Sequence, residues 1–189
     1  QLLTDDADPE GEPLRRAATV AAQLAAARRE AGSFSFSRPE WKVRVSEDGE
    51  EIQIKPITPG SPSRRLVSEM MILVNRLGAE HAAEADVPVI YRVQERPTGD
   101  LPDISPDDPT AFAQLRGLIQ PASLSLKPGW HWGLGLPAYT QLSSPLRRYA
   151  DLIGQRQIGA ALAGEPPPYS PQELLKILAN AESTERELK

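Results

Sequence analysis

The segment Ser144–Arg148 (SPLRR) contains residue types that suit the binding of a phosphate group. Serine followed by proline is a typical helix start, so the pattern predicts a helix from Ser144 through Leu162. Arg147 and Arg148 would then lie in the first turn, where unsatisfied N–H groups and the helix dipole favour an anion. A phosphate there would meet N–H donors, a hydroxyl and guanidinium groups. The segment therefore predicts either an anion site or a solvated helix start with an unfavourable charge sign.

Carboxylates could hold the metal ions that hydrolysis of a phosphodiester usually needs. The densest acidic cluster is Asp5-Asp6-Ala7-Asp8, and further aspartates lie between residues 103 and 108. Both groups are more typical of solvated ends, turns and helix caps than of a metal site. The chain has no cysteine, and its two histidines, His81 and His131, are far apart, so a zinc site is not expected. Any metal would be a hard cation such as magnesium.

The composition is that of an ordinary globular protein. The chain has 189 residues, of which 40% are hydrophobic and 25% charged, and its formal net charge is −5. An acidic chain has no general basic coat for nucleic acid, so binding to a polyanion would need a local basic site. No apolar run approaches the roughly 20 residues that span a bilayer, and the lack of cysteine fits a reducing compartment. We therefore expect a cytoplasmic protein without a membrane partner.

Periodicity along the chain predicts the elements that must position this segment. Helical spacing of apolar residues predicts helices over residues 13–31, from Ser61 through Leu77, over 109–118, over 144–162 and from Ser170 onward. Alternation and β-branched residues predict strands at 41–45, 52–54 and 87–93. Asp48-Gly49 predicts a hairpin turn, and the glycine-bearing stretch Trp130–Gly135 predicts a sharp turn or close backbone approach. We expect an α+β fold with helices packed around a mixed, largely antiparallel sheet.

Three ordered motifs resemble the RNB family, which includes ribonuclease II and ribonuclease R. The stretch Gly133–Leu152 (GLGLPAYTQLSSPLRRYADL) resembles the family signature. Phe34–Val45 (FSFSRPEWKVRV) and the helix Leu66–Asn75 (LVSEMMILVN) precede it in the order that the family has. The resemblance extends over nearly the whole chain. It implies that residues 1–189 are the C-terminal part of a catalytic RNB domain, and the last helix, which reaches Lys189 without a stop signal, also indicates a fragment.

The resemblance implies processive hydrolysis of single-stranded RNA from the 3′ end, with magnesium and release of nucleoside 5′-monophosphates. In the family, the metal-binding aspartates lie well upstream of the matched segments, and cold-shock and S1 domains flank the catalytic domain. The Asp5–Asp8 cluster is too close to Phe34 to be that motif. We therefore expect the metal ligands to lie outside this chain, which alone should be inactive. The implied partners are single-stranded RNA and the remainder of its own RNB domain, and the oligomeric state is left open.

Transferred position by position, the resemblance assigns catalytic roles to Arg147, at the scissile phosphate, and to Glu185. It places Phe36 against bases near the 3′ end, where stacking is worth roughly 1–3 kcal/mol per base. Without the resemblance, Phe36 would be read as a core residue of a short strand. The other residues that it assigns to RNA binding are Ser68, Glu69, Tyr139, Ser143, Ser144, Arg148 and Arg156.

Two positions depart from the family pattern. Ser68 stands where the family usually has the first of two glutamates, thought to contact ribose, so discrimination between RNA and DNA is left open. Gln155 replaces a histidine that commonly precedes Arg156. These departures and the acidic charge leave a second hypothesis, an RNB-like module that binds RNA or a protein without hydrolysis. A helical structural domain with chance arginine pairs is the third.

Overall fold

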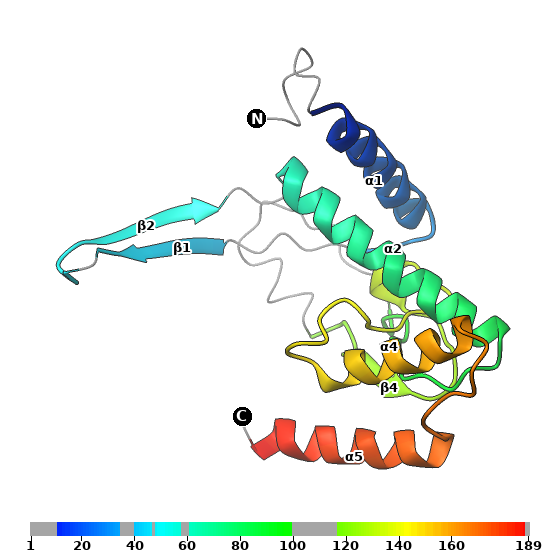
Figure 1. The fold of residues 1–189 in the computed structure, drawn as a ribbon. Helices are drawn as coiled ribbons and strands as arrows, with labels where there is room; N and C mark the ends of the chain where they lie inside the picture. The colour runs from blue at the N-terminus through cyan, green and yellow to red at the C-terminus, as the bar shows by residue number, and fades with distance from the viewer. Residues whose placement is uncertain (1–10, 35–39, 47, 58–60, 100–116, 188–189) are drawn as a thin grey trace.

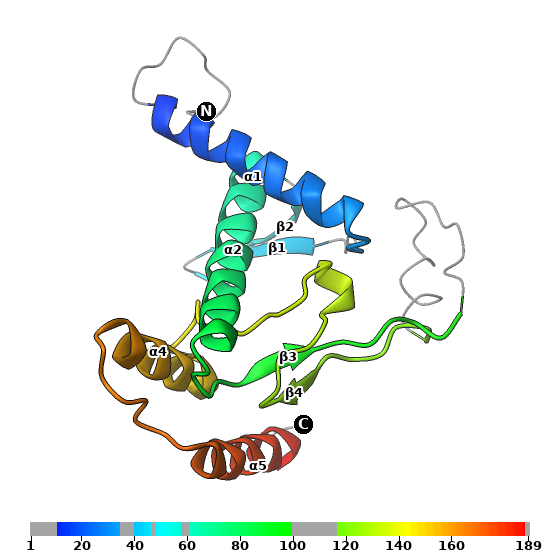
Figure 2. The same ribbon diagram turned by 90° about the vertical axis from the view of Figure 1, so that its right-hand side faces the viewer.

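The computed structural model describes residues 11–34, 40–46, 48–57, 61–99 and 117–187. Its helices are α1 (Glu12–Glu30), α2 (Pro62–Glu84), α4 (Tyr149–Leu162) and α5 (Pro171–Glu187), and a 3₁₀ turn, η2, spans Trp132–Leu134. Its strands are β1 (Glu40–Val45), β2 (Ile52–Ile57), β3 (Tyr91–Val93) and β4 (Ser123–Ser125). In Figure 1, β4 and α4 lie at one end of α2, and the β1–β2 hairpin projects away from them; Figure 2 shows β3 beside β4.

The described strands form two separate antiparallel pairs. In the hairpin, Val43 lies opposite Ile54, and in the second pair Arg92 lies opposite Leu124. Gly49 has a φ of 75°, the left-handed backbone that the Asp-Gly motif predicted for the hairpin turn. The predicted α+β class is confirmed, with its strands in two small sheets. The helix predicted over 109–118 lies almost wholly outside the described residues.

The first two helices begin close to where the sequence predicted. Helix α1 contacts α2, and its buried residues, Ala21 and Ala25, are small enough to allow a close approach. Figure 2 shows the two helices crossing, with α2 running on toward α4. Ser61 occupies the N-cap of α2 and Pro62 its first position, as the Ser-Pro pattern predicted. Among the described residues, no helix is both long and apolar enough to cross a membrane.

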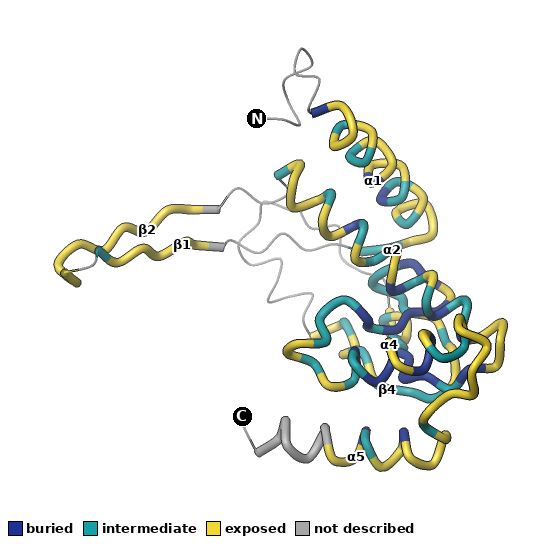
Figure 3. Tube along the Cα trace, viewed as in Figure 1, coloured by how far each residue is buried: buried dark blue, intermediate teal, exposed yellow. Residues whose placement is uncertain are grey.

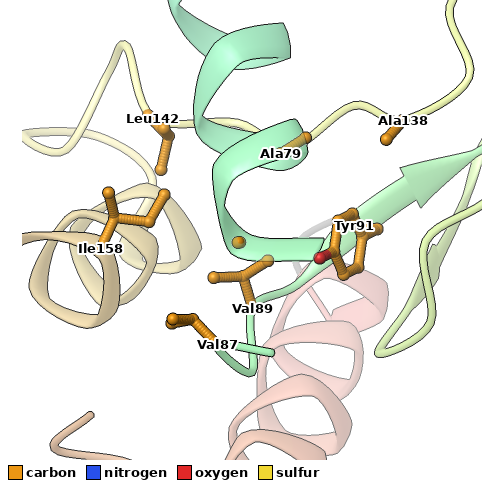
Figure 4. Close-up of a cluster of buried hydrophobic side chains, with 8 residues drawn as sticks. Ala79, Val87, Val89, Tyr91, Ala138, Leu142 and Ile158 are labelled. Carbon is orange, nitrogen blue, oxygen red and sulfur yellow. The ribbon is translucent and has the colours of Figure 1, made fainter. Parts of the chain in front are cut away.

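The main core lies at the C-terminal end of α2 (Figure 4). Its buried residues come from α2, the segment leading into β3, the segment before α4, and α4 itself: Ala79, Ala82, Val87, Val89, Tyr91, Ala138, Leu142 and Ile158. Leu142 packs against two helices at glycines. A Cβ on Gly154 of α4 would lie 2.8 Å from Leu142 Cδ2, and a Cβ on Gly78 of α2 would also collide with this leucine. The segment before α4 is therefore held tightly between these helices.

The strand predicted over Val87–Val93 is shorter in the structure, because β3 begins only at Tyr91. Proline at position 88 has no N–H to donate to a neighbouring strand. Side chains satisfy the preceding carbonyl groups instead: Gln157 Nε2 donates to Pro88 O at 2.7 Å, and Thr140 Oγ1 donates to Ile90 O at 2.7 Å. The apolar side chains of this stretch are buried, so their composition reflects the core rather than pairing in a sheet.

At Gly135 the backbone lies close to another segment of the chain, as the sequence predicted for Trp130–Gly135. It has a φ of 64°, and a Cβ there would lie 2.7 Å from Arg28 O and 3.0 Å from Ser33 N. We predict that Gly135→Ala lowers the free energy of unfolding by about 2–4 kcal/mol, from left-handed backbone and overpacking together. Gly164, with a φ of 73° and nothing near its Cβ, is the control. Gly164→Ala should cost only about 1–2 kcal/mol. Equal losses in urea unfolding would contradict the close approach.

Candidate functional site

The helix predicted to start at Ser144 starts instead at Tyr149, so that prediction is wrong. Residues 145–147 form a turn, and the amides of Arg147 and Arg148 donate to Ser144 O at 3.2 and 3.0 Å. Arg148 then takes an extended conformation, with φ −126° and ψ 109°, which separates the turn from the helix. The first turn of α4 holds Asp151, the charge sign that a helix N-terminus favours. The predicted reversal of charge at the helix start is therefore also wrong.

Asp151 explains why the chain turns before it becomes helical. Its side chain is fully buried, with 0% exposure, and accepts the amide of Ser144 at 2.9 Å. The guanidinium of Arg148 donates to both carboxylate oxygens, with Nε at 2.8 Å and a terminal nitrogen at 2.6 Å. A buried carboxylate requires such partners, since an unpaired charge in the interior is costly. The clamp made by Asp151, Arg148 and the Ser144 amide therefore fixes the turn.

The two adjacent arginines consequently differ in what they can bind. Arg148 is committed to Asp151, while the guanidinium of Arg147 makes no hydrogen bond or ion pair with any part of the chain that the structure describes. Arg147 is exposed, and so are its neighbours Leu146, at 102%, and Tyr149, at 56%. The hydroxyl of Ser144 also has no protein partner among the described residues. An anion could therefore reach a guanidinium and a hydroxyl beside exposed apolar groups.

Asn75 of α2 attaches the segment before this turn to the core. Its amide Nδ2 donates to the hydroxyl of Tyr139 at 2.9 Å and to that of Ser143 at 3.4 Å, and its Oδ1 accepts the amide of Leu142 at 2.8 Å. Asn75 is 2% exposed and Tyr139 is 8% exposed. The structure thus places Tyr139 and Ser143, which the sequence assigned to RNA binding, in hydrogen bonds that hold the backbone.

Glu69 is placed in a second internal ion pair. It is buried, and Arg28 of α1 donates to both of its carboxylate oxygens, one of them at 3.2 Å from Nε. Arg28 also donates to Leu134 O at 3.2 Å, so the pair joins α1, α2 and the η2 turn. Ser68 beside it is exposed on α2. Of the two positions that the sequence assigned to ribose contact, only Ser68 faces outward.

The remaining candidate residues are dispersed. Arg156 is exposed and donates to the hydroxyl of Tyr169 at 2.8 Å. Gln155 donates to Leu142 O at 2.6 Å, so it supports the same segment as Asn75. Phe36, the Asp5–Asp8 cluster and the aspartates between 103 and 108 lie outside the described residues. Glu185 belongs to α5, but its side chain also lies outside them.

His131 is part of the framework rather than of the exposed turn. Its amide donates to Leu136 O at 2.8 Å, and its ring meets that of Tyr139 edge-on at 5.4 Å between centroids. Burial, with the nearby positive charge of Arg92, lowers the pKa of His131 to about 4. The ring is therefore neutral near pH 7, and its buried Nδ1 has no hydrogen-bond partner among the described residues.

Sequence reasoning missed several residues on which the site depends. Asn75 interrupts the apolar run MMILVN, and a polar residue among buried apolar ones was a usable signal. Asp151 follows Arg148 by three residues, a spacing at which side chains on a helix can meet. Arg28 and Tyr149 carried no local signal, since the role of each depends on what the fold leaves buried or exposed.

The chain is similar to known proteins over most of its length. The family model described as the RNB domain matches residues 2–164. An uncharacterised ribonuclease of Synechocystis is 35% identical over 184 residues, covering 94% of this chain and 27% of that protein. The chloroplastic and mitochondrial ribonuclease II of Arabidopsis thaliana is 32% identical, covering 81% of this chain and 20% of that protein. The chain thus spans less than a third of the length of these relatives.

Solved structures show the same fold at lower identity. The Dss1 exoribonuclease from Candida glabrata superposes with a TM-score of 0.75 and 23% identity, covering 93% of this chain and 24% of that one. Mycoplasma genitalium RNase R, solved with ribose-methylated single-stranded RNA, gives a TM-score of 0.67 and 21% identity, covering 84% of this chain and 30% of that one. Yeast Ssd1, described as a pseudonuclease, gives a TM-score of 0.59. Because these identities are all below 25%, the similarity establishes that this chain has the same fold as these proteins.

Arg148 is bound to Asp151 and Arg147 is not, so we predict that replacing each of them has a different effect on stability. Arg148→Ala leaves the buried Asp151 carboxylate without its counterion, and we expect it to lower the free energy of unfolding by about 3 kcal/mol, the lower part of the range for a broken buried pair. Arg147→Ala should change it by less than about 0.5 kcal/mol, because its side chain is exposed. Denaturant unfolding of both variants measures this. Equal stabilities would show that the clamp does not hold the turn.

The lowered pKa of His131 predicts a dependence of stability on pH. The unfolded chain takes up this proton near pH 6.5, whereas the folded chain does so only near pH 4. The free energy of unfolding should therefore fall as the pH decreases from about 6.5 to about 4, and the contribution of this group should be constant above that window. His131→Phe, which keeps a ring but cannot titrate, should reduce the loss between pH 7 and pH 5. An identical loss in both proteins would contradict the assignment.

Proposed function

We infer, because this chain belongs to the RNB domain family, that the complete protein is a 3′→5′ exoribonuclease. It would act on single-stranded RNA and release nucleoside 5′-monophosphates processively. The observation that carries the proposal for this chain is the exposed guanidinium of Arg147 in a turn fixed by buried Asp151. The relatives named as ribonucleases and the neighbouring RNase R solved with single-stranded RNA support it.

In this proposal, Arg147 binds the scissile phosphate. A guanidinium can donate two parallel hydrogen bonds to phosphate oxygens, and it would neutralise the charge that develops on them during cleavage. The hydroxyl of Ser144 offers a neutral donor beside it. The clamp fixes the backbone that carries both groups and leaves their side chains available, since Asp151 binds Arg148 and the Ser144 amide. Positions fixed before the RNA arrives reduce the entropy that binding must overcome.

The exposed neighbours of Arg147 suit the bases of a single strand. The ring of Tyr149 offers an aromatic face, and stacking on such a face tolerates any base. Leu146 adds apolar surface next to it. We assign base contact to Tyr149 and, as the family resemblance implies, to Phe36. Ser68 remains as the candidate for ribose contact, because Glu69 is occupied by Arg28.

The other candidate residues receive supporting roles. Tyr139 and Ser143 hold the chain on Asn75, and Arg148 holds Asp151, so their effect on RNA would act through the position of the turn. Arg156 contacts Tyr169 at the start of the α5 region. For Arg156 and Glu185 we retain the roles that the resemblance implies, as proposals.

The residues described here do not provide a metal site. Among them, no group of at least three histidine, aspartate or glutamate side chains lies close enough together to hold an ion. As the family resemblance implies, we assign magnesium, which the complete enzyme is proposed to use, to ligands outside this chain. No step is assigned to it here, and the contribution of this chain is the binding and positioning of RNA.

Arg147→Ala in the complete protein tests this function. We predict that release of nucleoside monophosphates from single-stranded RNA falls by about 10²–10³-fold, the typical effect of removing one group that stabilises developing charge. Arg147→Lys should retain part of the activity, because it keeps the charge but not the planar fork. Lys176→Ala, which removes an exposed positive charge from α5, is the control and should leave the rate unchanged.

Two outcomes would contradict the proposal. Unchanged release by Arg147→Ala would remove the role assigned to this side chain. If the unaltered complete protein binds single-stranded RNA with a steep dependence on salt but releases no nucleotide, the chain belongs to a binding module that has lost hydrolysis. Yeast Ssd1, described as a pseudonuclease, has a similar fold.

A further inference from the structure

The β1–β2 hairpin carries a group of positive charges on one of its two faces. Lys42 lies directly opposite Lys55 in the register, and Arg44 follows Lys42 two residues along the same strand. Successive side chains of a strand point to opposite faces, so these three cations share one face with Gln53, the partner of Arg44. We call Lys42, Arg44 and Lys55 the basic hairpin face.

The charges of the basic hairpin face are not neutralised within the described chain. All three residues are exposed, and none of their side chains makes a hydrogen bond or ion pair with any residue that the structure describes. Figure 3 shows the hairpin exposed along nearly its whole length. Like charges directly opposite one another destabilise an antiparallel pair, so Lys42 and Lys55 oppose the pairing of their own strands. The arrangement becomes favourable when a ligand with several negative charges lies across it.

Two arginines on the helices show the contrast. Arg16 pairs with Glu12 at 2.7 Å, and Arg76 pairs with Glu80 at 2.7 Å. The carboxylate of Asp48 in the hairpin turn instead accepts hydrogen bonds from within the turn. The chain has a formal net charge of −5, and a polyanion can bind to such a protein only at a local basic site. The basic hairpin face meets that requirement.

We propose that the basic hairpin face is a second phosphate-binding surface for single-stranded RNA, separate from Arg147. Each of its three side chains can contact a phosphate of the RNA backbone, and such contacts are independent of the bases. Figure 1 shows the hairpin projecting away from α4, just before which Arg147 lies, so one phosphate cannot reach both. The surface binds a part of the RNA that is remote from the scissile phosphate. The proposal rests on the proposed function, from which it takes RNA as the ligand.

An acidic protein segment fits the basic hairpin face less well. The centres of protein interfaces are depleted in lysine and enriched in aromatic residues. The apolar side chains of the hairpin, such as Val43 and Ile54, lie on the opposite face, and the basic hairpin face has only Gln53 between its charges. Phosphates need nothing more than positive charge and hydrogen-bond donors.

Two separate contacts on one RNA make its binding depend on its length. An RNA that reaches both Arg147 and the hairpin gains from the second contact without a second loss of translational freedom. A short RNA bound at Arg147 does not reach the hairpin. Loss of the basic hairpin face should therefore weaken the binding of long RNA and leave that of short RNA unchanged.

Equilibrium binding of two RNAs to the complete protein tests the surface. One has about 4 nucleotides and the other about 30, well beyond the roughly 4–16 nucleotides that one single-strand-binding domain covers. Both carry a 3′-terminal linkage that resists hydrolysis. One variant combines Lys42→Ala, Arg44→Ala and Lys55→Ala. The controls are Gln53→Ala, on the same face but uncharged, and Lys176→Ala, which removes an exposed charge from α5.

We expect the triple variant to bind the long RNA about tenfold more weakly at low salt, while both controls stay within about twofold of the parent. The slope of log K against log salt should decrease in magnitude by about 2, because each phosphate contact with a single strand contributes about 0.7. The affinity for the short RNA should not change.

Lys55→Glu separates RNA binding from a structural role. It places a carboxylate opposite Lys42, which favours the pairing of the two strands. The thermal unfolding midpoint should therefore equal or exceed that of the parent, while the affinity for the long RNA falls. If these lysines served the fold alone, stability would change and RNA binding would not.

Unchanged affinity and salt slope for the long RNA in the folded triple variant would overturn the proposal. Equal weakening of both RNAs would also overturn it. So would a lower midpoint of Lys55→Glu with unchanged RNA binding, since an acidic protein segment would then be the occupant. A parent protein that releases no nucleotide but shows the expected binding differences would contradict the proposed hydrolysis and support this surface.

Discussion

The buried carboxylate of Asp151 is the constraint on which the candidate site depends. A carboxylate with no exposed surface must be neutralised and hydrogen-bonded, and the structure supplies the Arg148 guanidinium and the Ser144 amide. These bonds hold residues 145–147 as a separate turn, with extended Arg148 after it, so α4 begins only at Tyr149. They also occupy one of two neighbouring arginines, so the other is the one that can meet an anion. The burial of Asp151 thus determines which of the two arginines is available for the proposed phosphate contact.

Helix α2 connects this turn to the rest of the chain. Asn75 fixes the segment before the turn through Tyr139 and the Leu142 amide, and Glu69 receives Arg28 from α1. Polar residues inside an apolar helix act here as attachment points for segments distant in sequence. The same helix leaves an apolar stripe uncovered, formed by Val67, Met71, Val74 and Leu77, which fits a central element of a larger domain. The proposed phosphate site and the uncovered apolar stripe therefore depend on the same helix.

The sequence predicted what short-range rules control. The Asp-Gly hairpin turn and the starts of the first two helices follow from neighbouring residues. So does the start of the last helix, where Glu173 accepts the Ser170 amide at 2.8 Å. The sequence did not predict the features that depend on contacts between residues far apart in the chain. The pattern Ser144-Pro145 predicted a helix start, but α4 begins at Tyr149. The cause is the burial of Asp151, which the sequence does not reveal. Family resemblance drew attention to Tyr139, but only the structure shows its hydroxyl on Asn75, 64 residues away.

The most direct test is a structure of the complete protein with a short single-stranded RNA whose scissile phosphate resists hydrolysis. Our account predicts that the guanidinium of Arg147 lies within hydrogen-bonding distance of an oxygen of that phosphate, while Arg148 keeps both bonds to Asp151. A structure in which Arg148 leaves Asp151 to bind the phosphate, or in which Arg147 points away from the RNA, would contradict it.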